Sequence, residues 1–207
     1  AHANELLAKE LDCGYVYTTD AAVWSRSRAL NAGFAISHGR LLVSTDADMV
    51  FSPTSFERIL EIALAQPRAA YFLQCRDLPK GMDDDWVAAH PNEWEVMEKS
   101  SRIRPRWGMG GMMAISRQGF FEIRGFDERF HTYGGEDLDF AQRARRAGFK
   151  TVWVNDPDVR MYHMWHPSTR AIVDQTAEGR ATVERNRDIV YNDSSFVRNY
   201  LRWDHRP

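Results

Sequence analysis

The sequence predicts an α/β domain in which a central, mainly parallel sheet is flanked by helices. Short apolar runs of strand length alternate along the chain with longer amphipathic segments, which is the pattern of such a sheet. The 207 residues are 43% hydrophobic and 12% aromatic, enough for one sizeable core. No internal repeat, low-complexity segment or linker divides the chain, so residues 1–207 are expected to form a single domain.

Helices are expected where apolar residues recur at helical spacing between capping signals. Ser52 is a plausible N-cap with Pro53 in the first helical position, and Gly39 and Gly148 end helices. The helices predicted in this way cover residues 3–11, 26–37, 53–65 and 136–147, with further helical pieces in 169–203.

Strands are expected over residues 15–18, 41–45, 70–74, 112–116 and 151–154. The segment 78–106 mixes acids, tryptophans and prolines and is interpreted as an excursion from the sheet that contains some helix. Long excursions of this kind are often binding loops.

Composition excludes several classes of protein. The 27 basic and 29 acidic residues give a net charge of −2, which provides no basic footprint for nucleic acid. No apolar run approaches the roughly 20 residues of a membrane span, and no signal peptide is visible. We therefore expect a cytoplasmic protein that meets a membrane only peripherally. Cys13 and Cys75 form no CxxC pair, which argues against zinc ribbons and leaves a disulfide between them open.

Two acids follow a predicted buried strand in "STDADMVFSP", residues 44–53. Ligands of α/β sheets bind beyond the carboxyl ends of strands, which is where Asp46 and Asp48 stand. An Asp-x-Asp turn can hold one Mg²⁺ or Mn²⁺, and that cation can hold a diphosphate. The alternative is that both acids only cap a turn.

A second group of acids opens the helix predicted after "YGG", where Gly134 and Gly135 allow close approach of a ligand. A carboxylate of Glu136 or Asp137 at that mouth could act as a general base. The helix dipole also favours acids in a first turn, which could fully account for Asp139.

Two histidines, His163 and His166, lie three residues apart in "MYHMWHPS". Imidazole accepts Mn²⁺, although a lone histidine is more often a hydrogen-bonded structural residue. The spacing lacks the HExxH context of a zinc protease. Other conspicuous residues have plainer interpretations: Trp86, Trp94 and Trp153 as core or loop anchors, and Arg143, Arg145 and Arg146 as an exposed helix face.

Five stretches together resemble one family. These are "WSRSRALNAGF" (24–34), "STDADMVFSP", "GMGGMMAISRQGFFEIRGFDERF" (108–130), "YGGEDLDFAQRARRAGF" and "HMWH". In this order the chain resembles the metal-dependent GT-A glycosyltransferases, and looks closest to the β-1,4-galactosyltransferase-like group and related bacterial polysaccharide synthases. Each motif is weak alone, and the match extends along most of the chain.

The resemblance implies a metal site. Asp48 would bind the cation, with Asp46 beside it on the metal or the nucleotide. His166 would be the late metal ligand, and His163 falls where vertebrate members carry a methionine ligand. The implied cofactor is Mn²⁺, or Mg²⁺ in its place.

The resemblance also implies contacts to both substrates. Asp137 would be the catalytic base for the acceptor hydroxyl, and Glu136 would orient sugar hydroxyls. The remaining residues of the implied site are Trp24 near the nucleotide, Arg26 at the phosphates, Trp107 and Tyr133 at the sugars, and Gly110 and Gly111 where backbone passes the donor.

The implied function is metal-dependent, inverting transfer of a sugar from a nucleotide-diphosphate donor, by family default a UDP-sugar, to a glycan or polysaccharide hydroxyl. Retaining relatives tend to carry asparagine where this chain has Asp137, which favours inversion. Family members usually open with strands that contact the base, and only one helix precedes residue 15 here. The N-terminal strands are therefore expected to be missing, shortened or supplied elsewhere.

Two other classes remain open at this point. A catalytically inactive GT-A-like domain that binds a glycan or a partner would fit the missing strands, although Asp48, Asp137 and His166 argue against it. A nucleotidyltransferase would share the sheet and the metal, but no glycine-rich phosphate loop follows the first strand.

Overall fold

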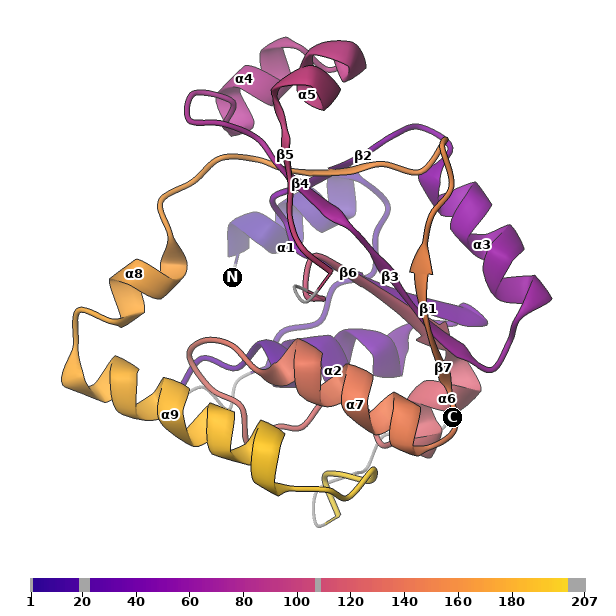
Figure 1. Cartoon of the computed structure of the whole chain (residues 1–207), viewed down its shortest axis with the longest axis vertical. Helices are drawn as coiled ribbons and strands as arrows, with labels where there is room; N and C mark the ends of the chain where they lie inside the picture. Colours follow the sequence, from indigo (N-terminus) through magenta and orange to yellow (C-terminus); the bar gives the residue numbers. More distant parts are fainter. Residues whose placement is uncertain (1, 19–22, 107–108, 201–207) are drawn as a thin grey trace.

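The computed structural model describes residues 2–18, 23–106 and 109–200. Two four-stranded sheets form its centre (Figure 1). The central sheet has the order β1 (Leu41–Thr45), β6 (Met112–Ser116), β3 (Ala69–Leu73), β7 (Lys150–Val154). The second sheet has the order β2 (Met49–Phe51), β8 (Met161–His163), β4 (Cys75–Asp77), β5 (Arg102–Ile103).

The α/β class is confirmed, with one correction to the strand directions. β3 and β7 pair in parallel, but β6 lies between β1 and β3 and runs antiparallel to both. Parallel neighbours need a crossover connection, usually a helix. β6 instead follows the excursion through the second sheet, and it enters the central sheet from the opposite end.

The helices lie close to their predicted positions. They are α1 (His2–Glu10), α2 (Arg26–Ile36), α3 (Ser55–Ala65), α4 (Asp84–Ala89), α5 (Trp94–Ser100), α6 (Arg117–Glu122), α7 (Glu136–Arg146), α8 (Thr169–Val173) and α9 (Ala177–Asn192). Two details of the prediction were wrong. Thr54, not Ser52, is the N-cap of α3. Residues 15–18 are not a strand, since no neighbouring strand in the described chain pairs with them.

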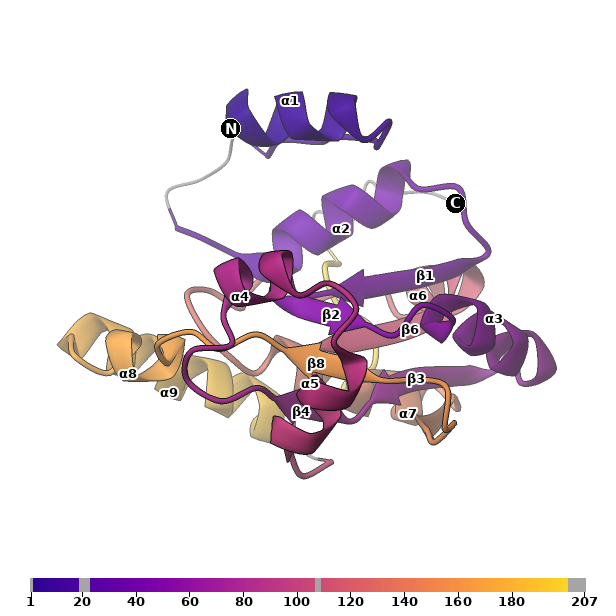
Figure 2. The same ribbon diagram turned by 90° about the horizontal axis from the view of Figure 1, so that it is seen from above.

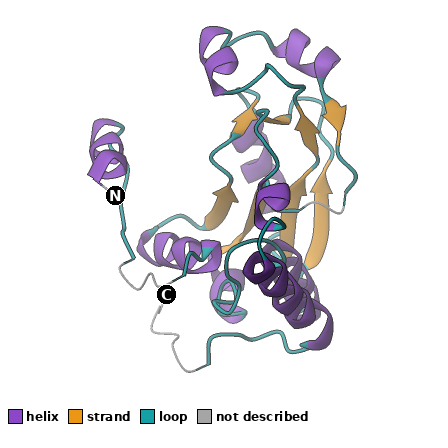
Figure 3. Ribbon diagram, turned by 90° about the vertical axis from the view of Figure 1, so that its left-hand side faces the viewer, coloured by secondary structure: helices purple, strands orange, loops and turns teal. Residues whose placement is uncertain are grey.

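Both faces of the central sheet are buried, which β3 shows most clearly. Ala70 and Phe72 face a cluster formed with α2, α6 and α7, whereas Tyr71 and Leu73 face α3 and the second sheet. Figure 2 shows helices on both sides of the strands. α1 lies apart from both sheets in Figures 2 and 3, and its Leu6 and Leu7, like Leu11 just after it, are exposed.

A buried ion cluster fixes α7 against the rest of the domain. We define the α7 ion cluster as Asp127, Asp139, Arg143 and Arg198, which are all at most 2% exposed. Arg143 Nε lies 2.7 Å from Asp139 Oδ2. Arg198 bridges the two acids, with Nη2 at 3.1 Å from Asp139 Oδ1 and Nε at 2.8 Å from Asp127 Oδ2. The prediction that Arg143 lies on an exposed face was therefore wrong, because its i−4 acid and the carbonyls of residues 123 and 125 hold it inside.

Two findings concern the cysteines and the membrane, both of which the sequence analysis addressed. Cys13 is exposed and Cys75 buried, and both are free thiols. Within the described residues, no helix combines the length and the apolar character needed to cross a bilayer.

Candidate functional site

The site begins where β1 ends and the chain turns into β2. Asp46 Oδ1 lies 2.5 Å from Nη2 of Arg26, the first residue of α2, and the Asp46 amide donates to the carbonyl of Gly111 at 3.3 Å. Burial raises the pKa of the Asp46 carboxyl, and Arg26 opposes that rise. Asp46 is therefore an arginine-paired acid at the edge of the central sheet.

Asp48 faces the two histidines across the second sheet. Its Oδ2 lies 3.1 Å from His166 Nε2 and 3.5 Å from His163 Nε2, and the two Nε2 atoms are 3.0 Å apart. The contact with His163 keeps the pKa of the Asp48 carboxyl below its ordinary value and raises the pKa of His163. The other oxygen, Oδ1, is buried and has no hydrogen-bond partner among the described residues.

The register of the second sheet produces this convergence. β2 pairs with β8 so that Met49 stands opposite His163, and the Met164 amide donates to the Asp48 carbonyl at 2.9 Å. On the other side of β8, β4 places Asp77 opposite His163. Asp77 Oδ1 lies 2.9 Å from His163 Nδ1, so a proton on that nitrogen leaves Nε2 free to accept or ligate.

The donor set fits Mn²⁺. Ligand atoms of Asp48, His163 and His166 all lie within 4.8 Å of one another. Mn²⁺ is a hard cation that accepts imidazole beside carboxylate ligands, whereas Mg²⁺ is held almost entirely by oxygen ligands, so one carboxylate with two imidazoles fits Mn²⁺ better than Mg²⁺. A second grouping, Cys75 with Asp77 and His163, fits a cation poorly. Burial raises the pKa of the Cys75 thiol to about 12, and Arg104 is hydrogen-bonded to Asp77.

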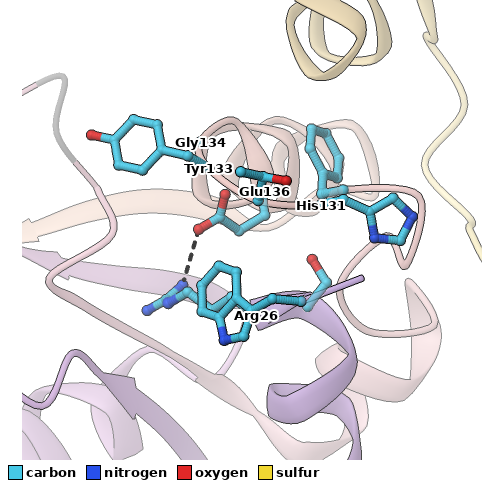
Figure 4. Close-up of a pocket in the computed structure, with 9 residues that line it drawn as sticks. Arg26, His131, Tyr133, Gly134 and Glu136 are labelled. Carbon is cyan, nitrogen blue, oxygen red and sulfur yellow. Dashed lines mark ion pairs between the residues drawn. The ribbon is translucent and has the colours of Figure 1, made fainter. Parts of the chain in front are cut away.

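The acids at the start of α7 lie on the other side of Arg26. Glu136 Oε1 is 3.5 Å from Arg26 Nη1, the ion pair drawn in Figure 4. Burial, followed by the charge of Asp137, raises the pKa of Glu136. A Cβ placed on Gly110 would lie 3.2 Å from Asp137 Oδ2. Asp137 therefore stands beside the Gly110 backbone, whose carbonyl accepts from Arg26 at 3.2 Å.

A pocket opens over this pair. Its walls come from the start of α2 and from the loop before α7, and it is lined by Trp24, Arg26, Ser27, Phe130, His131, Thr132, Tyr133, Gly134 and Glu136 (Figure 4). The indole of Trp24 is exposed, which leaves an aromatic face at the rim. Burial raises the pKa of the Tyr133 phenol above its ordinary value.

The structure thus gathers the sequence-predicted site residues in two adjoining groups. One is the Asp48–His163–His166 cluster and the other is the pocket at the start of α7, and the Arg26–Asp46 pair lies between them. Trp107 lies outside the described residues. Gly111 has a packing reason of its own, because a Cβ there would lie 3.0 Å from methyl carbons of Met49 and Met161. Asp77 and Arg104 were missed, since an Asp and an Arg separated by 26 residues carry no local signal before the β4–β8 pairing is known.

Comparisons with known proteins identify the family and the fold. Residues 3–130, more than half of the chain, match the family model for glycosyl transferase family 2, and residues 95–167 match that for the N-terminal domain of galactosyltransferase. An N-acetylglucosaminyl-diphospho-decaprenol L-rhamnosyltransferase of Mycobacterium tuberculosis is 26% identical in an alignment of 186 residues that covers 78% of this chain. Beta-1,4-galactosyltransferase 4 of Cricetulus griseus is 36% identical over 76 residues, 36% of this chain.

A solved structure shows the same architecture. The crystal structure of GalNAc-T7 with UDP, GalNAc and Mn²⁺ superposes with a TM-score of 0.57 at 17% identity, covering 92% of this chain and 41% of that one. The chain spans 59% of the mycobacterial relative and 22% of the hamster relative. The family match and the superposition together establish that this chain has a GT-A fold and belongs to glycosyl transferase family 2.

Proposed function

We propose that this chain is a metal-dependent, inverting glycosyltransferase that moves a sugar from a nucleotide-diphosphate donor to a glycan or polysaccharide hydroxyl. The observation that carries the proposal is the convergence of Asp48, His163 and His166 beside a second pair of acids, Glu136 and Asp137. One group fits a cation, and the other offers a base.

Asp48, His163 and His166 would hold Mn²⁺, with Mg²⁺ as the weaker alternative. When bound, the cation would neutralise charge on a diphosphate leaving group. Asp46 lies beside this group and keeps Arg26 in place. Arg26 Nη1 is buried and makes no hydrogen bond within the described residues, so it is suited to a phosphate oxygen.

Asp137 would accept the proton of the acceptor hydroxyl, a contribution of about 10²–10⁴-fold to the rate. Glu136, half-buried and paired with Arg26, would orient sugar hydroxyls. Trp24 and Tyr133 would provide apolar surface for the base and the sugar at the pocket of Figure 4. Direct displacement with Asp137 on the face opposite the leaving group would invert the anomeric centre.

UDP is the donor nucleotide that we propose, in line with the UDP and Mn²⁺ of the GalNAc-T7 crystal structure. Membership of glycosyl transferase family 2 argues against the nucleotidyltransferase alternative. An inactive binding domain would differ in one respect, since it would bind donor or glycan without transferring sugar.

Calorimetric titration with UDP, in the presence and absence of Mn²⁺, tests the donor site. We expect binding that requires Mn²⁺ and that Asp48→Ala abolishes. Lys99→Ala is the matched surface control, since the exposed Lys99 side chain pairs with Glu95 on α5, on a helix that carries none of the proposed ligands. UDP binding of equal strength without Mn²⁺, or unchanged in Asp48→Ala, would refute the metal assignment. Release of sugar from UDP-sugars by the intact protein would separate an enzyme from an inactive domain.

A further inference from the structure

The loop before α7 has an unusual backbone that is held by two other parts of the chain, the start of α2 and helix α9. Residues 130–135, here called the α7 entry loop, contain positive φ angles at Thr132 (63°), Gly134 (82°) and Gly135 (99°). Thr132 is β-branched, and such residues rarely adopt this conformation. The surrounding structure must therefore impose the path of the loop.

One side of the α7 entry loop is tied to the start of α2. The Thr132 amide donates to the Trp24 carbonyl at 3.0 Å, and the Ser25 hydroxyl donates to the Phe130 carbonyl at 2.8 Å. These contacts link the loop to the segment that carries Arg26.

The other side is held by a single amide of α9. Asn186 is 3% exposed, and its Nδ2 lies 2.9 Å from the His131 carbonyl, 3.1 Å from that of Tyr133 and 3.0 Å from that of Gly134. Three acceptors around one nitrogen identify it as the donor end of the amide. Val190, one turn further along α9, packs against Gly135.

We infer that Asn186 is a positioning residue for this site: it fixes the α7 entry loop so that Tyr133 faces the pocket and Glu136 meets Arg26. That the loop positions residues for sugar transfer rests on the proposed function, whereas the claim that Asn186 fixes the loop does not. No family motif found in the sequence includes this residue, and Asn186 lies 50 residues beyond Glu136 along the chain.

The test replaces Asn186 by aspartate, which keeps the shape but puts an oxygen against three carbonyl oxygens. The matched control is Thr182→Val one turn earlier on α9, where the buried threonine accepts a hydrogen bond from Arg185, so that a hydrogen bond is lost away from the loop. Asn186→Ser is the second variant, since it keeps a small polar group without the repulsion and serves if Asn186→Asp does not fold.

Hydrogen–deuterium exchange tests the holding directly. We expect amides of residues 131–135 to exchange about tenfold faster in the Asn186 variants, as for one lost hydrogen bond of ordinary strength. Exchange in the central sheet should stay as in the parent, and Thr182→Val should leave the loop unchanged. Equal exchange of the loop in parent and Asn186 variants, or equal acceleration by Thr182→Val, would overturn the inference.

Two further measurements separate this inference from the proposed function. UDP binding with Mn²⁺ should stay within about threefold of the parent, whereas kcat for sugar transfer should fall about 10²-fold, as misplacement of a reacting group by about 1 Å predicts. A variant that loses UDP affinity and kcat together, with the loop unchanged, would contradict a positioning role. A parent that binds no UDP would refute the proposed function and leave the exchange result to decide the holding of the loop.

Discussion

Replacement of Asp139 by alanine should destabilise the domain strongly, because it would break the α7 ion cluster from its centre. Asp139 accepts from Arg143 at 2.7 Å and from Arg198 at 3.1 Å, and both arginines are at most 2% exposed. Without Asp139, Arg143 keeps its hydrogen bonds to the carbonyls of residues 123 and 125 but loses the carboxylate that pairs with it directly, while its charge stays buried.

The magnitude follows from these two contacts. Each is a hydrogen bond between charged groups, worth about 1.5–3 kcal/mol. Breaking a buried pair by removing one partner costs about 3–5 kcal/mol, and we expect a loss of that size in the free energy of unfolding. A domain has about 5–15 kcal/mol in total, so the variant should unfold at clearly lower urea concentration.

Urea unfolding followed by tryptophan fluorescence measures this loss. Arg145→Ala is the control on the same helix, since Arg145 is exposed and its removal should cost at most about 0.5 kcal/mol. A loss below about 1 kcal/mol for Asp139→Ala, the size of a surface pair, would show that the cluster is hydrated and would refute the reasoning.

Three further predictions concern the site and the cluster. Saturating Mn²⁺ should stabilise the parent by about 2.7 kcal/mol at 100 times its dissociation constant and should not stabilise Asp48→Ala, as thermal unfolding with Mn²⁺ or EDTA would show. Asp137→Asn should lower kcat for sugar transfer by about 10²–10⁴-fold and leave calorimetric UDP binding nearly intact, and a full rate would exclude Asp137 as the base. The third prediction concerns the pH dependence of stability. Burial raises the pKa values of Asp193 and Asp127, but hydrogen bonds outweigh it: Arg129 and Ser195 lower the pKa of Asp193 from 3.8 to about 2, and Arg129 also lowers the pKa of Asp127. These depressed values stabilise the fold above pH 3.8, so unfolding free energy should fall as the pH drops towards 2, less steeply in Asp193→Asn.

The long periodic elements could be predicted from the sequence. β1 and β6 have the predicted bounds, and α2 and α7 end within one residue of them. Each has either a continuous apolar run or a clear capping signal, so local physics decides its state. The buried side-chain amide of Asn31 on α2 exchanges two hydrogen bonds with the Phe126 backbone and so ties α2 to the segment after α6.

The second sheet could not be predicted, because its strands have only two or three residues. A run of that length carries no readable periodicity, and its stability comes from packing against the core. The burial of Arg143 could not be predicted either, because it depends on Arg198 and Asp127, which come from distant segments of the chain. Charge pattern alone favours an exposed arginine, and only tertiary partners reverse that preference.

The candidate metal cluster depends on this unpredictable sheet more than on its own motif. In a strand, successive side chains point to opposite faces, so a slip of β8 by one residue would turn His163 away from Asp48 and from Asp77. The register is fixed on both sides, by Met49 opposite His163 on β2 and Asp77 opposite it on β4. Met161, on the same strand β8, is buried against Gly111, the residue directly before β6. This contact links the register of β8 to the central sheet. The Asp-x-Asp pair can therefore be recognised from sequence, but its histidine partners are selected by strand pairing. Substitutions that disturb the β2–β8 register should weaken cation binding even where every ligand residue is kept.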